Sequence, residues 1–175
     1  MRGRMLVTYA SLKGSTTGVA RTIADELCAQ GFAVDVMPVG LITRLHAYSA
    51  VIVGSAIYHA RPLDEAIDFL DTFHAPLSRM PVAYFLVGLT MKQADGEPQK
   101  PLAPLRTAAP HVKPVSIGTF AGAFDSRQWP LVILLSLKSR GELPADGDLR
   151  DWNAIRRWTR AVMPALQSGS PAHSG

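Results

Sequence analysis

The residues best suited to chemistry lie in one short loop, 11–16, between an apolar run and a helical pattern. The loop consists of Ser11, Leu12, Lys13, Gly14, Ser15 and Thr16. Its hydroxyls can donate hydrogen bonds to an anion, its lysine adds positive charge, and its glycine lets the backbone approach closely. A helix starting at the loop's end also directs free N–H groups and the positive end of its dipole here. The loop predicts a phosphate site; the alternative is that residues 15–18 only cap the helix and form a turn.

The pattern of this loop excludes two common nucleotide sites. It does not match G-x-x-x-x-G-K-[ST], which binds triphosphates, or G-x-G-x-x-G, which binds dinucleotides. The apolar runs at 4–10 and 50–57 also end without the carboxylates that form the acidic pocket of a receiver domain. These three comparisons argue against a triphosphate site, a dinucleotide site and the acidic pocket of a receiver domain.

Apolar periodicity predicts strands that alternate with helices. Continuous apolar runs, typical of strands buried on both faces, predict strands at 4–10, 33–39, 50–57, 81–89 and 113–124. Helical spacing and start signals predict helices at 15–30, around 40–47, from Pro62, near 102–109 and at 150–166. The alternation implies parallel pairing, and hence an α/β, flavodoxin-like doubly wound five-stranded parallel sheet of order 2-1-3-4-5. Such sheets bind ligands beyond strands 1 and 3, where loop 11–16 lies.

Composition indicates one globular domain. The chain has 175 residues, 47% hydrophobic and 18% charged, and we expect a single domain over 1–166 with a disordered tail over 167–175. The net charge of +4 favours anionic ligands, anionic membrane surfaces or acidic partners, and the scattered Lys and Arg residues do not indicate nucleic acid. Its one cysteine, Cys28, excludes an intramolecular disulfide and favours a reducing cytoplasm. No apolar run reaches the length of a transmembrane helix.

Three motifs in order along the chain resemble one protein family. YASLKGST (9–16) resembles the FMN phosphate loop of flavodoxin-family proteins. VIVGSAIYHARPLDEAIDFL (51–70) resembles the second flavin loop of a subgroup that includes menaquinone-dependent protoporphyrinogen IX dehydrogenase. GDLRDWNAIRRW (147–158) resembles the final-helix motif of that subgroup. The resemblance implies an FMN-dependent oxidoreductase in which the flavin carries the chemistry without a catalytic side chain.

The resemblance also implies where the flavin ring lies. One wall would be Ser55, Ala56, Ile57 and Tyr58, and the other Gly88, Leu89, Thr90, Met91 and Lys92. Tyr58 either stacks on the ring or is an exposed tyrosine before a helix. Lys92 either favours the negative charge of reduced flavin or is a solvated surface lysine. The sequence shows neither paired carboxylates, a Ser/His/Asp arrangement nor a metal-ligand pattern, so we expect no metal.

Residues 124–140, FDSRQWPLVILLSLKSR, are unusual because a helix from Trp129 would be apolar on nearly every face until Lys138. A surface helix of a small domain needs only one apolar stripe, and basic residues flank this one on both sides. We expect residues 129–137 to make a peripheral membrane contact, to line a quinone or porphyrin pocket, or to be buried in a homodimer. The alternative is a core element. The subgroup above has an extra segment at the same place.

Three functions are compatible with these features. The first is an enzyme, cytoplasmic or peripheral to the inner face of the membrane, that oxidises a reduced substrate such as protoporphyrinogen IX in heme biosynthesis and passes electrons to a quinone. The second is a soluble flavodoxin-type electron carrier. Carriers of that family are strongly acidic proteins, so the net charge of +4 weighs against this function. The third is a partner-binding module that has lost FMN, against which the intact loop 11–16 argues.

Overall fold

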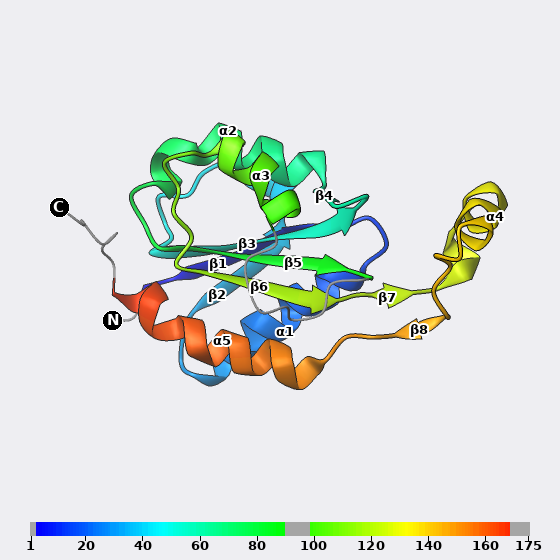
Figure 1. Cartoon of the computed structure of the whole chain (residues 1–175). Coiled ribbons are helices and arrows are strands. Elements are labelled where there is room, and N and C mark those ends of the chain that lie inside the picture. The colour runs from blue at the N-terminus through cyan, green and yellow to red at the C-terminus, as the bar shows by residue number, and fades with distance from the viewer. Residues whose placement is uncertain (1–2, 90–98, 169–175) are drawn as a thin grey trace.

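The computed structural model describes residues 3–89 and 99–168, which form an α/β fold around a central sheet (Figure 1). Its parallel strands lie side by side in the order β2-β1-β3-β5-β6. Their bounds are β1 Met5–Ala10, β2 Val34–Pro38, β3 Ala50–Tyr58, β5 Val82–Gly88 and β6 Ser116–Ala121. Counted along the chain, this is the predicted order 2-1-3-4-5, so the doubly wound sheet is confirmed.

Helices cover both faces of the sheet. On one face lie α1 (Ser15–Ala29) and α5 (Trp152–Gln167), and on the other α2 (Asp64–Leu77) and α3 (Gln99–Ala108) (Figure 1). Because β2 and β3 flank β1 on opposite sides, the chain winds in both directions from β1. The loops after β1 and β3 therefore separate at a switch point, where α/β sheets bind ligands.

The register of the strands brings four loops to one edge of the sheet. Ala10 at the end of β1 pairs with Ser55 of β3, and Gly88 at the end of β5 pairs with Ala121 of β6. Because all four strands are parallel, the segments that follow them begin at the same edge. The phosphate loop and both expected flavin walls thus start close together.

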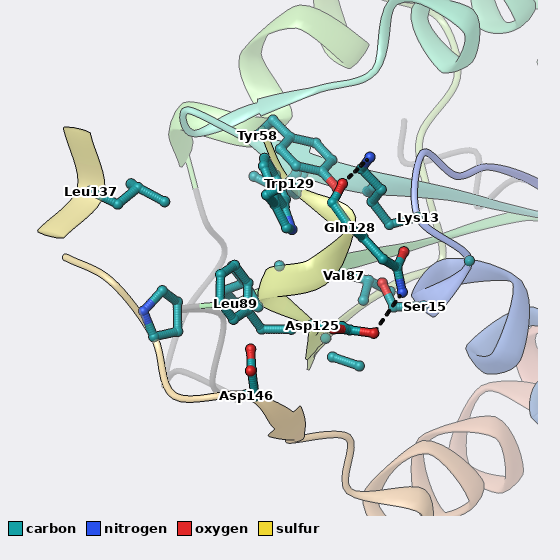
Figure 2. Close-up of a pocket in the computed structure, with 18 of the residues that line it drawn as sticks. Lys13, Ser15, Tyr58, Val87, Leu89, Asp125, Gln128, Trp129, Leu137 and Asp146 are labelled. Carbon is teal, nitrogen blue, oxygen red and sulfur yellow. Dashed lines mark hydrogen bonds between the residues drawn. The ribbon is translucent and has the colours of Figure 1, made fainter. Parts of the chain in front are cut away.

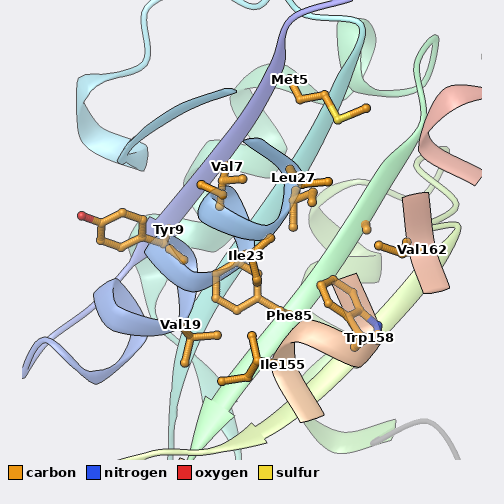
Figure 3. Close-up of a cluster of buried hydrophobic side chains, with 14 of the residues drawn as sticks. Met5, Val7, Tyr9, Val19, Ile23, Leu27, Phe85, Ile155, Trp158 and Val162 are labelled. Carbon is orange, nitrogen blue, oxygen red and sulfur yellow. The ribbon is translucent and has the colours of Figure 1, made fainter. Parts of the chain in front are cut away.

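A hydrophobic core lies between the sheet, α1 and α5, and it includes the α1 residues that follow loop 11–16 (Figure 3). It includes Val19, Ile23, Leu27, Phe85, Ile155, Trp158 and Val162. Gly54 of β3 lies under the Phe85 ring, which a Cβ at Gly54 would overlap. Each large apolar side chain buried here stabilises the fold by about 1.5–3 kcal/mol. The first turn of α1 therefore rests on a rigid base.

An ion pair joins the two helices of this face. Arg160 of α5 donates through Nε to Oε1 of Glu26 in α1, at 2.7 Å, and the Glu26 side chain is almost fully buried. The hydrogen bond from Arg160 holds the pKa of Glu26 below its ordinary value, although burial opposes this.

The helix expected to begin at Pro62 begins later. Pro62 belongs to β4 (Arg61–Pro62), which pairs antiparallel with the end of β3. The Leu63 N–H donates to Ser55 Oγ at 2.9 Å, and α2 begins only at Asp64. A tight hairpin therefore stands where the sequence suggested a direct strand-to-helix turn.

Two further elements differ from their predictions. The helix expected at 40–47 is only a short 3-10 turn, η1 (Val39–Leu41). The strand expected at 113–124 splits, because β6 ends at Ala121 and β7 (Ala123–Phe124) leaves the sheet. β7 pairs antiparallel with β8 (Gly147–Asp148).

The ribbon of β7 and β8 carries a projecting segment, residues 122–150, which we call the arm. It holds η2 (Ser126–Gln128) and α4 (Leu131–Ser139) away from the sheet (Figure 1). Every residue of α4 is at least partly exposed. The alternative that 129–137 forms part of the core is therefore wrong. The ribbon holds α4 away from the sheet, so no layer of the described protein covers both sides of this helix.

Candidate functional site

Loop 11–16 forms an anion cradle at the start of α1. Gly14 has a left-handed φ of 88°, and its N–H donates to Ser11 Oγ at 3.1 Å. The Gly18 N–H bonds back to the Gly14 carbonyl at 3.3 Å. The N–H groups of residues 15–17 precede it in the first turn and have no acceptor within the helix. These donors and the helix dipole favour a bound phosphate.

Thr16 supplies a second reason to expect an anion here. It is fully buried, and its Oγ1 has no hydrogen-bond partner in the part of the chain that the structure describes. Leaving such a hydroxyl unpaired costs about 1–3 kcal/mol. A phosphate oxygen held by the cradle would provide the missing acceptor. Direct contact of the Ser11 and Thr16 hydroxyls with a phosphate stays a prediction.

Lys13 has a different role from the one its position in the loop suggested. Its Nζ donates to the backbone carbonyl of Gln128 at 2.8 Å and lies 5.5 Å from the centre of the Trp129 ring (Figure 2). Lys13 therefore links the cradle to the arm. Its charge remains within the same cleft.

A cleft of about 970 Å³ joins the cradle, the strand ends and the arm (Figure 2). The predicted residues that line it are Lys13, Gly14, Ser15, Ala56, Ile57, Tyr58, Gly88 and Leu89. Four others do not reach its lining: Ser11, Leu12, Thr16 and Ser55. The last three predicted residues, Thr90, Met91 and Lys92, lie outside the described residues. The size is that of a pocket for a cofactor or another small molecule.

The wall after β3 is held by a buried serine. Ser55 Oγ donates to the Ala56 carbonyl and accepts the Leu63 N–H, both at 2.9 Å. Ser55 therefore fixes the hairpin and does not face the cleft. At the hairpin tip, His59 and Ala60 have positive φ angles of 49° and 58°. Two such residues in succession make the tight turn that a two-residue hairpin needs, and non-glycine residues hold this conformation at a cost typical of functional sites.

Aromatic side chains from β3 and from the arm meet at the cleft. The Tyr58 and Trp129 rings lie 5.7 Å apart, between centres, at 45° (Figure 2). Phe124 of β7 lies 6.0 Å from Trp129. Burial raises the pKa of the Tyr58 phenol. Tyr58 is thus part of an aromatic wall, and Trp129 is a residue that the sequence singled out only as the start of an apolar segment.

Two carboxylates fix the turn that carries Trp129. Asp125 accepts the Arg127 N–H at 3.1 Å and pairs with the Arg127 guanidinium at 2.9 Å. These bonds lower the pKa of Asp125 to about 2. Asp146, from the far side of the arm, accepts the Ser126 N–H at 2.6 Å and its hydroxyl at 2.8 Å. These polar contacts therefore order the arm together with the aromatic contacts of Trp129.

Arg150 fastens the arm to the first turn of α1. Asp148 holds its guanidinium at 2.7 and 2.8 Å, and the Trp152 ring lies 4.4 Å from it. Its remaining nitrogen donates to the Ser15 carbonyl at 3.3 Å. A Cβ at Gly18 would overlap this nitrogen, so the glycine permits the approach. The motif at 147–158 thus contacts the cradle through the bond from Arg150 to Ser15, which the sequence alone did not reveal.

Comparison with known proteins identifies the family of the chain. A family model described as Flavodoxin domain matches residues 6–132, from β1 into the start of α4. The chain belongs to the flavodoxin domain family. It is therefore an FMN-binding flavoprotein. The cradle, the unpaired Thr16 hydroxyl and the open strand ends fit that cofactor.

The most informative relative is an enzyme. The chain is 26% identical over 211 residues to a Leishmania major protein described as protoporphyrinogen IX dehydrogenase [quinone], covering 97% of this chain and 87% of that protein. Solved structures include a flavodoxin from the domain Archaea, at 17% identity and a TM-score of 0.59, covering 93% of this chain and 98% of that chain. A mutant flavo di-iron protein from Thermotoga maritima has 16% identity and a TM-score of 0.61, covering 95% of this chain but 36% of its own. These structural likenesses show the fold.

Within residues 3–89 and 99–168, no group of three or more His, Cys, Asp or Glu side chains is arranged to hold a metal. No helix in those ranges combines the length and hydropathy needed to cross a bilayer.

Proposed function

We propose that this flavodoxin domain is an FMN-dependent oxidoreductase that oxidises a porphyrinogen-like substrate and delivers the electrons to a quinone. The observation that carries the proposal is the arm, which adds an aromatic and apolar wall to the flavin cleft through Phe124, Trp129, Ile133 and Leu137. An electron carrier that meets protein partners needs an exposed flavin edge and not a cleft that extends beyond it. The similarity to the Leishmania protein over nearly the whole chain supports the same conclusion.

The residues of this chain would bind the cofactor in two parts. The cradle at 11–16 holds the phosphate, and Ala56 to Tyr58 and Val87 to Leu89 border the space for the ring. When bound, FMN accepts an electron pair from a reduced substrate and passes it to an acceptor. Because the cofactor carries that chemistry, the protein's contribution is to position the substrate and exclude water.

The arm would position the flat quinone and the pyrrole rings of the porphyrinogen. Tyr58, Phe124 and Trp129 provide aromatic surface, which binds planar rings with large contact area at low entropic cost. At the rim, Arg127 is highly exposed, although it is paired with Asp125. Its guanidinium can exchange that partner for a substrate carboxylate. The cleft thus combines an apolar floor with a cation at its mouth, as a ring system that bears carboxylates requires.

The deciding experiment is an anaerobic assay of the purified flavoprotein. Protoporphyrinogen IX is added with a water-soluble naphthoquinone, and product fluorescence and quinol formation are followed together. We expect substrate-dependent quinol formation. Flavin that is reduced only by a reductase protein, without turnover of the porphyrinogen, would instead identify an electron carrier.

Variants separate the arm from the cofactor site. We expect Trp129→Ala to lower kcat/KM for the quinone about tenfold, since an aromatic contact of about 1.5 kcal/mol is lost. FMN binding should change little. Leu143→Ala is the matched control, because Leu143 lies on the arm, is 38% exposed and does not line the cleft. Equal effects of the two changes would contradict the role of the aromatic wall.

A further inference from the structure

The two sides of α4 face different surroundings. Ile133 and Leu137, one turn apart, line the cleft. Leu131, Val132 and Leu135 are 70%, 69% and 57% exposed. Leu131 and Leu135 are also one turn apart, so they and Val132 share a face of the helix. We call these three residues the outer face of α4.

This exposure is concentrated on the arm. The large apolar residues that are exposed elsewhere in the described chain, such as Leu12, Leu41 and Val115, are scattered singly. By contrast, four exposed large apolar residues lie within the nine residues of α4. Isolated exposed leucines are ordinary, whereas a contiguous apolar patch marks a surface that is covered by something.

The shape of the arm favours a planar surface over a second protein. The nine-residue α4 is about 14 Å long, so its outer face provides only a small part of the roughly 800 Å² that each partner of a stable complex buries. α4 also stands at the far end of the ribbon, beyond the helices that cover the sheet (Figure 1). A flat surface can therefore meet α4 without touching the body of the molecule.

The charges around the outer face indicate an anionic surface. Lys138 lies in the last turn of α4 and forms no ion pair with a described carboxylate, and Arg140 follows it. Arg140 has Glu142 at 3.9 Å, a distance at the limit of an ion pair. The chain as a whole carries a net charge of +4. An apolar face with cations at its end is the pattern of a helix that lies in the headgroup region of an anionic bilayer.

We propose that α4 is a docking helix whose outer face inserts into the interfacial zone of an anionic lipid bilayer. Its inner face remains the wall of the flavin cleft. If the proposed quinone activity holds, docking brings that wall to the phase in which long-chain quinones dissolve. The docking itself does not depend on the activity, and it is measured without any redox substrate.

The first test is co-sedimentation of the purified holoprotein with vesicles. We expect binding to phosphatidylcholine vesicles that contain phosphatidylglycerol and weaker binding to phosphatidylcholine alone. Leu131→Gln with Leu135→Gln should lower the partition coefficient about tenfold, because two apolar side chains no longer enter the interface. Lys138→Gln with Arg140→Gln should remove the preference for the anionic vesicles.

Leu41→Gln is the matched control, since Leu41 is 68% exposed but lies on η1, far along the chain from the arm. It should bind vesicles as the wild type does. Hydrogen exchange of the unmodified protein gives a readout that needs no variant. Amides at 131–139 should become protected when anionic vesicles are added, while the amides of η1 should not.

Three outcomes would overturn the proposal. The first is equal loss of binding in the Leu41 control and in the outer-face variant. The second is protection by vesicles anywhere other than the arm. The third is a dimer in light scattering that the outer-face variant converts to a monomer, which would assign the face to a second copy of the chain. Activity with a water-soluble quinone in vesicle-free buffer should be unchanged in the outer-face variant. Absence of that activity in the wild type would contradict the proposed function, and it would not change the interpretation of the vesicle-binding result.

Discussion

The cradle at 11–16 and the arm at 122–150 lie on one cleft but are built by opposite means. The cradle is short, continuous in sequence and supported by a packed core under α1. The arm is formed by two segments that are joined through a two-residue ribbon pairing and through the Asp146 carboxylate, which accepts hydrogen bonds from Ser126. The half of the cleft assigned to the cofactor is therefore rigid and local. The half assigned to the substrate depends on polar contacts at the surface.

The sharpest way to test this comparison is Thr16→Val in the cradle. The change removes a buried hydroxyl that lacks a partner and keeps the shape of the side chain. The apoprotein should become more stable by up to about 1 kcal/mol, while FMN affinity falls about 10- to 100-fold. Urea unfolding and flavin fluorescence titration give the two values. Riboflavin, which lacks the phosphate, is the control ligand, and an equal loss of its affinity would contradict contact with the phosphate.

Asp146→Ala makes the corresponding change in the arm. Without this carboxylate the Ser126 N–H and hydroxyl lose their acceptor, so the turn before Trp129 loosens. We expect KM for the quinone to rise about fivefold to tenfold, since hydrogen bonds to a charged group contribute about 1.5–3 kcal/mol. FMN affinity should remain within about twofold, because the cradle does not contact Asp146. Steady-state kinetics and flavin titration distinguish the two effects.

Lys13→Met tests the hydrogen bond to Gln128, which joins the cradle to the arm as the bond from Arg150 to Ser15 also does. The substitution keeps the side-chain length and removes the donor. We expect about a threefold loss of FMN affinity and faster proteolysis of the arm, since an exposed charged hydrogen bond is modest in strength. Lys13→Arg should restore arm protection. If Lys13→Met weakens FMN binding and leaves the arm as resistant as before, the lysine acts on the phosphate alone.

The smallest effect concerns the base on which the cradle rests. The pKa of Glu26 is lowered in the folded protein, so its pair with Arg160 stabilises the fold above the ordinary carboxyl pKa. That contribution is lost as pH falls from the ordinary pKa through the lowered one. Glu26→Gln should therefore reduce the melting temperature slightly at pH 7 and not at all in strong acid. Asp25→Asn, which changes an exposed carboxylate of α1 outside the pair, is the control variant for the same measurement.

The sequence predicted the scaffold well because its signals are local. Continuous apolar runs identified the strands that are buried on both faces, and alternation with helices determined the parallel order. Lys13, Gly14 and Ser15 line the cleft, and their contact with FMN stays a prediction. Ser55 was predicted to face the flavin, yet it fixes the hairpin by bonding Leu63, eight residues away.

The arm was predicted less well because its contacts join distant residues. Nothing in the sequence near Lys13 indicates that its partner is Gln128, 115 positions later, or that Arg150 reaches Ser15. The periodicity of 113–124 predicted one strand because β6 and β7 are both apolar. Only the pairing of β7 with β8 shows that the chain leaves the sheet there.

The sequence by itself determined the doubly wound sheet, the cradle at its switch point and the presence of an unusual apolar segment. Tertiary structure decided what that segment does, because whether an apolar helix is buried depends on which elements are available to cover it. Here α4 has the cleft on one side and no protein layer described on the other. Burial is a property of the whole fold, whereas hydrophobic periodicity is a property of a short stretch of chain, so only the first could distinguish a core element from an exposed one.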